Sequence, residues 1–186
     1  MAQIGHNKGP TLATGNGWQT HCWRRARQQL LPTLPIEVVR LRLKRAAEIG
    51  LDYKTYASIR ATTGQDVIAL LFSTNALRML KPGAQLPADR RDRLAAVTGT
   101  GRGALTLSPV TPEDLLKAVP TIDHAAPAPQ PFAAWPQTRQ AVQALLAQGK
   151  WPADRVVLIG DTMPEGDWVP AARLAWYVPA DRYFAA

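Results

Sequence analysis

The chain has 186 residues, of which 46% are apolar, so it resembles a globular protein with one core or two small cores rather than a disordered chain. No apolar run approaches the roughly 20 residues of a membrane-spanning helix, and the first residues lack the apolar stretch of a secretory signal. The single cysteine, Cys22, excludes an internal disulfide, and no Cys/His cluster has zinc-site spacing. We therefore expect a soluble, cytoplasmic protein with no membrane partner.

The formal net charge of +8 is distributed unevenly along the chain. Residues 1–110 contain 16 Lys and Arg against 6 Asp and Glu, a net +10, whereas residues 111–186 contain 6 against 8, a net −2. This asymmetry predicts that the first part contacts an anionic partner, nucleic acid before a membrane surface. The alternatives are a basic surface that maintains solubility, or one that docks on an acidic protein.

The first part of the chain is predicted to be a tail, 1–16, followed by a basic helical unit, 17–97. The tail is rich in Gly, Asn and Thr and has no hydrophobic periodicity. A helix is expected over 17–31, with an apolar stripe of Trp18, Cys22, Ala26 and Leu30. A second helix is expected from Pro35 to Gly50, with an apolar face of Ile36, Val39, Leu43, Ala46 and Ala47.

The next elements of this unit are a short capped helix and a strongly apolar segment. Asp52 is expected to cap a helix over 53–61, and Thr62-Thr63-Gly64 is expected to end it. The segment QDVIALLFSTNALRML, 65–80, is apolar nearly all round and must be buried. It is either a central helix, or a strand VIALLFS followed by a helix from Thr74. Because the apolar pattern runs past the usual length of a strand, we favour the helix. A short charged helix over 86–97 completes the unit.

Residues 98–186 are predicted to form a small α/β unit that packs with the helical unit, giving an α+β fold. Its expected helices follow the cap residue Thr111 and Pro136, and its expected strands are ALTLS at 104–108, 156–159 and 174–178. Residues 120–136 contain five prolines and are predicted to be an extended linker or a strap over the surface.

The opening IGHNKGP, residues 4–10, resembles an N-terminal IGHN-x-x-P peptide of uncharacterised bacterial and prophage-encoded proteins. It covers seven residues and implies no activity. The resemblance points to a bacterial source and to nothing further.

The stretch RVVLIGDTMPEGDW, 155–168, ends an apolar strand in Gly160-Asp161 and adds further acids within six residues. In open α/β sheets, ligands bind beyond the carboxyl ends of strands, where Asp161 is expected. The segment 138–177 resembles the fourth motif and surrounding αβ unit of haloacid-dehalogenase-like phosphatases. The resemblance implies that Asp161 holds Mg²⁺ together with Glu165 or Asp167, and Mg²⁺ does require oxygen ligands of this kind.

The rest of that family's active site has no clear counterpart in the sequence. The family uses an aspartate nucleophile in a D-x-D-x-T/V segment after an early strand, and Asp52-Tyr53-Lys54-Thr55 lacks the second acid and the strand. LLFSTN, with Ser73 or Thr74, resembles the family's second motif, and Lys117 matches its lysine by order alone. Carboxylates without a nucleophile cannot support the covalent route, so no catalytic residue is assigned.

Two further motifs resemble functional sites. TGTGRG, 98–103, has the glycines of a phosphate loop, but it is expected to follow a helix and open a strand, the reverse of that context. We interpret it as a flexible connection whose Arg102 can still touch a phosphate. His21 and Cys22 are adjacent, and side chains at i and i+1 diverge on a helix, so they do not form a catalytic pair.

The basic runs of the first two helices are the candidate partner-binding surface. Arginines contact phosphates, and an exposed tryptophan can stack on a base. The residues proposed are Arg24, Arg25, Arg27, Arg40, Arg42, Lys44 and Arg45. The alternative is that Trp18 packs inward and the arginines are merely solvated. A helix-turn-helix formed by 53–61 and 66–80 is disfavoured, because a reading helix needs several polar side chains and this one is mostly apolar.

The sequence therefore predicts a non-catalytic binding or adaptor protein whose basic helical face contacts nucleic acid or an acidic protein, with no cofactor. One alternative is a degenerate haloacid-dehalogenase-like phosphatase, and only this alternative needs Mg²⁺. Another is an interaction subunit of a larger assembly, with Phe132, Trp135 and Trp151 as anchors. A small-molecule substrate is not expected.

Overall fold

The structure, a computed structural model, describes residues 34–185. The chain divides into two compact units, Met1–Val39 and Arg40–Ala186, and the description below concerns the second unit and the helix Ile36–Glu48, which begins in the first. The predicted tail, the helix expected over 17–31 and the IGHN peptide lie outside the described residues.

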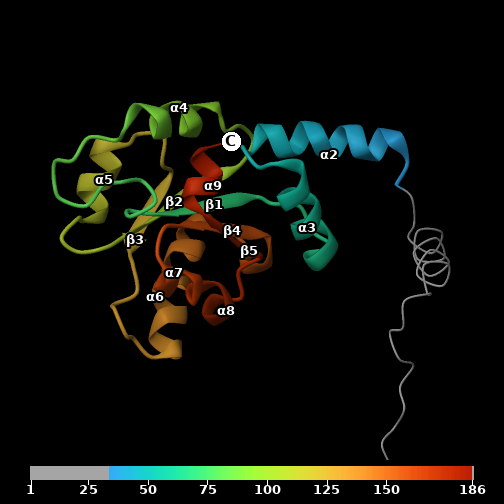
Figure 1. The fold of residues 1–186 in the computed structure, drawn as a ribbon. Helices are drawn as coiled ribbons and strands as arrows, with labels where there is room; N and C mark the ends of the chain where they lie inside the picture. Colours follow the sequence, from blue (N-terminus) through green and yellow to red (C-terminus); the bar gives the residue numbers. More distant parts are fainter. Residues whose placement is uncertain (1–33, 186) are drawn as a thin grey trace, which may run out of the picture. The chain divides into compact units, whose positions relative to one another are not determined.

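Within the described residues, five strands form one sheet in the order β3-β2-β1-β4-β5 (Figure 1). Every adjacent pair of strands is parallel. The strands are β1 Ala69–Ser73, β2 Gly101–Thr106, β3 His124–Pro127, β4 Val156–Gly160 and β5 Trp176–Pro179. The predicted combination of helices and strands is confirmed.

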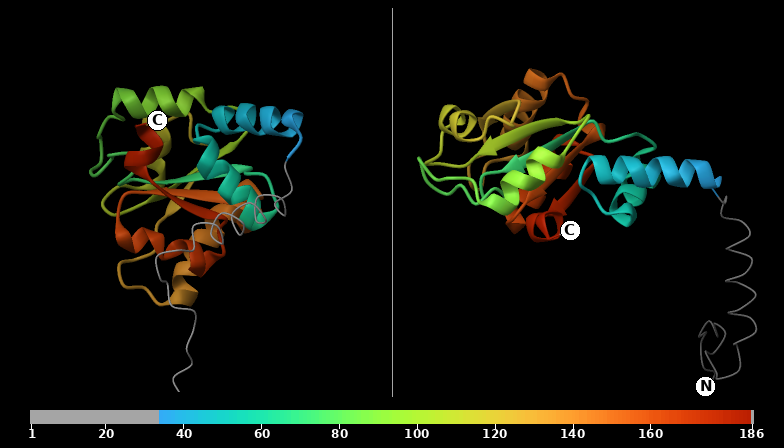
Figure 2. Two further views of the ribbon diagram at one scale, coloured as in Figure 1. Left: turned by 45° about the vertical axis from the view of Figure 1, so that its right-hand side comes forward. Right: turned by 90° about the horizontal axis from the view of Figure 1, so that it is seen from above.

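Helices connect the strands and cover both faces of the sheet. The helices are α2 Ile36–Glu48, α3 Tyr53–Thr63, α4 Ala88–Ala96, α5 Pro112–Ala118, α6 Trp135–Gly149, α7 Met163–Gly166, α8 Trp168–Ala172 and α9 Ala180–Phe184. Figures 1 and 2 show α4 and α9 on one face of the sheet and α6, α7 and α8 on the other. Among the described residues, no helix combines the length and apolar character needed to cross a lipid bilayer.

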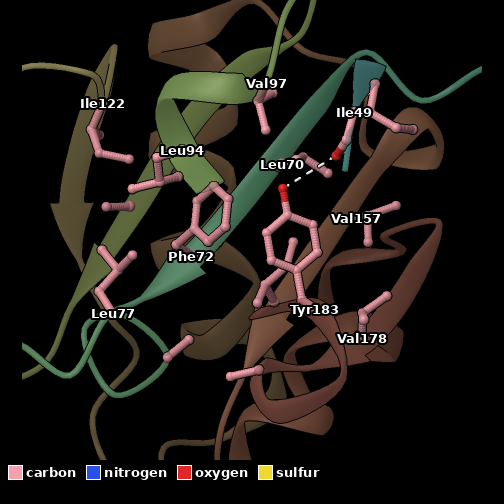
Figure 3. Packing of buried hydrophobic residues seen from close by; sticks show 14 of the residues in the cluster. Ile49, Leu70, Phe72, Leu77, Leu94, Val97, Ile122, Val157, Val178 and Tyr183 are labelled. Carbon is pink, nitrogen blue, oxygen red and sulfur yellow. Dashed lines mark hydrogen bonds between the residues drawn. The ribbon is translucent and has the colours of Figure 1, made fainter. Parts of the chain in front are cut away.

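The central strand β1 contributes to a separate core on each face of the sheet. Successive strand residues point to opposite faces, so Leu70 and Phe72 pack with the helices α3, α4, α5 and α9, while Ala69 and Leu71 pack with α6 and α8. On the first face, Tyr183 of α9 packs edge-on against Phe72 and donates a hydrogen bond to the carbonyl of Ile49 at 3.2 Å (Figure 3). Burial on both faces explains why β1 is apolar without alternation.

The preference for a helix over 66–80 was wrong, because Ala69–Ser73 is a strand and residues 74–80 form a turn and a short loop. A strand buried on both faces and a buried helix have the same uninterrupted apolar sequence. The backbone of β1 bonds to β2 on one side and to β4 on the other. The sheet thus joins a strand from segment 17–97 to strands from segment 98–186.

Two other expectations require correction. The segment 120–136 is not only a strap, because His124–Pro127 pairs with β2 as an edge strand. Proline is tolerated there, since an edge strand has one side without a partner. The apolar face predicted for the second helix is only partly buried: Ala46 is buried, Val39 is half-buried, and Ile36, Leu43 and Ala47 are exposed.

The predicted caps are confirmed. The carboxylate of Asp52 accepts a hydrogen bond from the backbone N–H of Thr55 at 2.9 Å, which begins α3. Gly64 ends the same helix with φ of +70°, a conformation that glycine adopts without steric cost. Thr111 caps α5 through the N–H of Asp114. Each of these signals is local, and for this reason sequence patterns predict them.

Candidate functional site

The candidate site lies at the carboxyl edge of the sheet, where β1 meets β4. After β1 the chain builds β2 and β3 on one side, and it then returns to build β4 and β5 on the other. In open α/β sheets, this switch point is where ligands bind. Thr74 and Asn75 follow β1 here, and Asp161 and Thr162 follow β4.

The buried carboxylate of Glu165 joins these two strand ends. The side chain is 1% exposed and belongs to the short helix α7. Its Oε2 accepts hydrogen bonds from the backbone N–H groups of Asp161 at 2.6 Å and Thr162 at 3.1 Å, and its Oε1 accepts one from the side-chain amide of Asn75 at 2.8 Å. Both carboxylate oxygens therefore hold the loops that leave β1 and β4.

Gly160 and Tyr177 complete the surroundings of this carboxylate. A Cβ atom at Gly160 would lie 2.7 Å from both Glu165 Oε2 and the Tyr177 ring, so only glycine fits. The Tyr177 hydroxyl donates to the carbonyl of Thr162 at 3.3 Å. Burial raises the pKa of Tyr177, and the charges of Glu165, Asp161 and Asp181 raise it further. Tyr177 therefore remains a neutral donor.

The hydroxyl groups at the end of β1 also have structural partners. Ser73 is fully buried, and its Oγ accepts from the backbone N–H of Ala76 at 3.0 Å. The Oγ1 of Thr74 accepts from the backbone N–H of Leu107, which follows β2, at 3.0 Å. The two hydroxyls shape the turn after β1 and link it to the end of β2.

The three acids predicted to bind metal do not share one environment. Asp161 and Asp167 are exposed, whereas Glu165 is buried and bonded as described above. Among the described residues, no group of three or more His, Cys, Asp or Glu is placed to hold a metal ion. Lys117 is exposed on α5 and lines a separate hollow with Lys81.

A pocket of about 340 Å³ adjoins this edge of the sheet, and the sequence analysis did not predict it. Its wall combines the ends of β2 and β4 with residues 129–135 and the helices α6, α7 and α8. We call it the aromatic pocket, because Phe132, Trp135 and Trp168 line it. Glu165 and Asp167 are its charged lining residues. The adjacent aromatics and prolines of 129–135 were the available signal, but only the fold shows that α7 and α8 face them.

The structure separates the proposed partner-binding residues into three groups. Arg24, Arg25 and Arg27 lie outside the described residues. Arg45 is structural: it pairs with Glu48 and Asp66 and donates to the carbonyls of Val67 and Gly99. On the same helix, α2, Arg40 and Lys44 are exposed and Arg42 is half-buried.

The TGTGRG segment serves packing. Gly101–Gly103 belongs to β2 and is not a flexible connection. A Cβ atom at Gly101, Gly103 or Gly149 would lie within 2.9 Å of the Trp151 side chain, so these glycines make room for that indole. Arg102 pairs with Asp123 at 3.7 Å and donates to a backbone carbonyl.

Trp151 is half-buried in this arrangement and packs edge-on against His124. Of the three aromatic residues predicted as anchors, Trp151 is therefore part of the fold. Phe132 is fully exposed, and Trp135 is 57% exposed.

The chain matches no protein-family model, and comparisons with curated proteins and with solved structures find no match. The resemblance of residues 138–177 to haloacid-dehalogenase-like phosphatases therefore stays a prediction.

Proposed function

We propose that the protein is a non-catalytic binding or adaptor protein. The observation that supports this most directly is the Glu165 carboxylate, which accepts three hydrogen bonds from groups that follow β1 and β4. At the switch point of an α/β sheet, enzymes place groups that are oriented toward a ligand. Here the buried polar side chains Ser73, Thr74 and Glu165 are oriented toward the protein's own backbone.

The phosphatase alternative lacks a nucleophile at the corresponding position. The resemblance implies an aspartate after an early strand, and β1 is the earliest strand in the described part of the chain. β1 ends at Ser73, and Thr74 and Asn75 follow it, so no carboxylate lies at this position. An aspartyl-phosphate intermediate has no residue to form on there.

A phosphatase assay tests the non-catalytic role. We expect no Mg²⁺-stimulated hydrolysis of p-nitrophenyl phosphate by the purified chain. The Asp161→Asn variant is the control. If the wild type shows residual hydrolysis, the variant should show the same rate, and that rate then comes from a contaminating enzyme. Turnover that requires Mg²⁺ and disappears in this variant would refute the proposal and favour the degenerate phosphatase.

We further propose α2 as a surface for an anionic partner, nucleic acid or an acidic protein. Arg40 and Lys44 are exposed on it and Arg42 is half-exposed, while Arg45 is oriented into the fold. A basic helix face attracts phosphates largely through counterion release, so affinity for nucleic acid should fall steeply with salt.

Replacing the three α2 residues Arg40, Arg42 and Lys44 with Ala tests this surface. We expect weaker binding to duplex or single-stranded DNA, and the slope of log K against log[salt] should decrease in magnitude by about 2.7 on duplex DNA and about 2.1 on single strands. A matched control removes the same charge from exposed positions elsewhere, namely Arg78, Lys81 and Lys117. Equal effects of the two triple variants, or no binding at low salt, would exclude α2 as a nucleic-acid surface.

A further inference from the structure

The aromatic pocket is bordered by large apolar side chains that extend into solvent. Phe132 is fully exposed, Met163 is 93% exposed and Trp135 is 57% exposed. Phe132 and Trp135 line the pocket, and Met163 precedes its lining residue Pro164. Clustered exposed apolar side chains of this size mark interaction sites more often than they mark ordinary surface.

The surface extends along the Pro-rich strap beyond the aromatic pocket. Pro129 and Gln130 also line two neighbouring hollows, one against α6 and one against the loop after β2. The hollow against α6 has a volume of about 440 Å³. Pro129 and Gln130 therefore border three hollows, as expected for a surface that a segment of a partner covers.

The charge of the aromatic pocket is opposite to that of the chain. Its lining includes the exposed Asp167 and the buried Glu165, and no Lys or Arg, although the whole chain has a net charge of +8. The exposed Asp161 precedes the lining residue Thr162. An occupant with complementary charge is cationic.

The backbone holds Phe132 in a conformation that its side chain does not favour. Its φ is +61°, in the left-handed region, where a non-glycine residue costs roughly 1–2 kcal/mol. The exposed ring recovers none of this cost by burial in the described structure. Strain at an exposed aromatic residue points to a contact made outside the fold.

From the exposed aromatics, the acidic lining and the strained Phe132, we propose that the aromatic pocket docks a segment of another protein that inserts a large apolar side chain flanked by Lys or Arg. The volume of about 340 Å³ is at the lower end of ligand sites and suits one side chain. A free small molecule in this volume would leave Phe132 and Met163 in water, whereas a protein segment covers them. The inference rests on the proposed binding role and concerns a second contact surface, separate from the basic face of α2.

Two synthetic peptides test the proposal: acetylated, amidated GRWRG and its acidic counterpart GEWEG. The readout is the indole N–H resonances of Trp135, Trp168 and Trp151 in the full chain, assigned with single Trp→Phe variants. We expect GRWRG to shift the resonances of Trp135 and Trp168 but not that of Trp151. GEWEG should bind about fivefold more weakly, since an exposed charge pair contributes up to about 1 kcal/mol.

Substitutions at the pocket provide the controls. Phe132→Ala should weaken GRWRG binding about fivefold or more, and the fold should stay intact, because the ring is fully exposed. Leu80→Ala removes another exposed apolar side chain, outside the pocket lining, and should have no effect. Asp167→Asn should reduce the preference for GRWRG over GEWEG.

Three outcomes would overturn the proposal. The first is no shift of the Trp135 or Trp168 resonance at peptide concentrations of several millimolar. A peptide with a dissociation constant of about 1 mM, a binding free energy of about −4 kcal/mol, would already shift them at such concentrations. The second is equal affinity for the two peptides. The third is a dimer in sedimentation that Phe132→Ala converts to a monomer, since a second copy would then occupy the surface. None of these outcomes bears on the phosphatase assay, so the two proposals fail separately.

Discussion

Replacing Glu165 with Ala should destabilise the protein strongly without involving any ligand. The substitution removes the acceptor of the backbone N–H groups of Asp161 and Thr162 and of the Asn75 amide. A hydrogen bond to a charged acceptor contributes about 1.5–3 kcal/mol, and an unpaired buried donor costs about 1–3 kcal/mol. Asp161 and Thr162 are exposed, so water can reach part of the site and reduce the loss.

We expect Glu165→Ala to lower the free energy of unfolding by about 3 kcal/mol, out of the 5–15 kcal/mol typical of a domain. With a urea m-value of about 2 kcal/mol/M, the unfolding midpoint should fall by about 1.5 M. Glu165→Gln should cost less, about 1 kcal/mol, since its remaining oxygen can accept from both backbone groups while Asn75 reverses its amide. Urea unfolding followed by circular dichroism measures all three proteins.

Asp161→Asn serves as the control, because it changes an exposed carboxylate and should alter stability by less than about 0.5 kcal/mol. The structural role of Glu165 would be refuted if Glu165→Ala unfolded at the same urea concentration as the wild type. It would also be refuted if Mg²⁺ raised the midpoint of the wild type but not of Glu165→Ala. A ligand that binds only the folded state produces such a shift, and the carboxylate would then be a metal ligand.

Three further predictions concern stability. Phe132→Gly should be more stable than Phe132→Ala by about 1 kcal/mol in urea unfolding, because glycine tolerates φ of +61°. Burial, together with the hydrogen bond to Asp66 and the charge of Asp66, raises the pKa of Tyr56 to about 12. The stability that the protonated Tyr56 contributes should therefore be fully present below pH 10 and be lost from pH 10 to about 12. Tyr56→Phe should flatten part of that decrease, and an unchanged decrease would contradict this. Arg45→Ala should lower the free energy of unfolding by about 2–3 kcal/mol, because it removes the contacts with Asp66 and Val67. Lys44→Ala, the control, should lower it by less than about 0.5 kcal/mol. Equal losses of stability in thermal unfolding would show that the contacts of Arg45 contribute little.

The acidic turn after β4 shows which features of the candidate site the sequence pattern predicted and which it did not. The apolar run 156–159 followed by Gly160-Asp161 correctly predicted a strand with an acid at its carboxyl end. The pattern did not distinguish the exposed Asp161 from the buried Glu165, because one of the donors to Glu165 is the side-chain amide of Asn75, 90 residues earlier in the chain. Two of the three donors to Glu165, the backbone N–H groups of Asp161 and Thr162, are local, whereas the third, the amide of Asn75, follows a different strand.

The aromatic residues near the strap illustrate the same limit. Phe132, Trp135 and Trp151 are equivalent in sequence, as aromatics in or beside a Pro-rich segment. Trp151 lies over glycines of β2 and α6, while Phe132 is in water. Trp151 is half-buried because the neighbouring glycines leave room for its indole, and Phe132 has no such neighbours in the described part of the chain. The local sequence around each aromatic residue does not contain this information.

The sequence by itself determined the elements whose signals lie within a few residues: the Asp52 and Thr111 caps, the Gly64 stop and the apolar strand at 156–159. Only the tertiary structure decided that 69–73 is a strand, that it lies between β2 and β4, and that Glu165 accepts a hydrogen bond from Asn75 after β1. The physical reason is that a strand obtains its hydrogen bonds from neighbours distant in the chain, whereas a helix cap obtains them from the next turn.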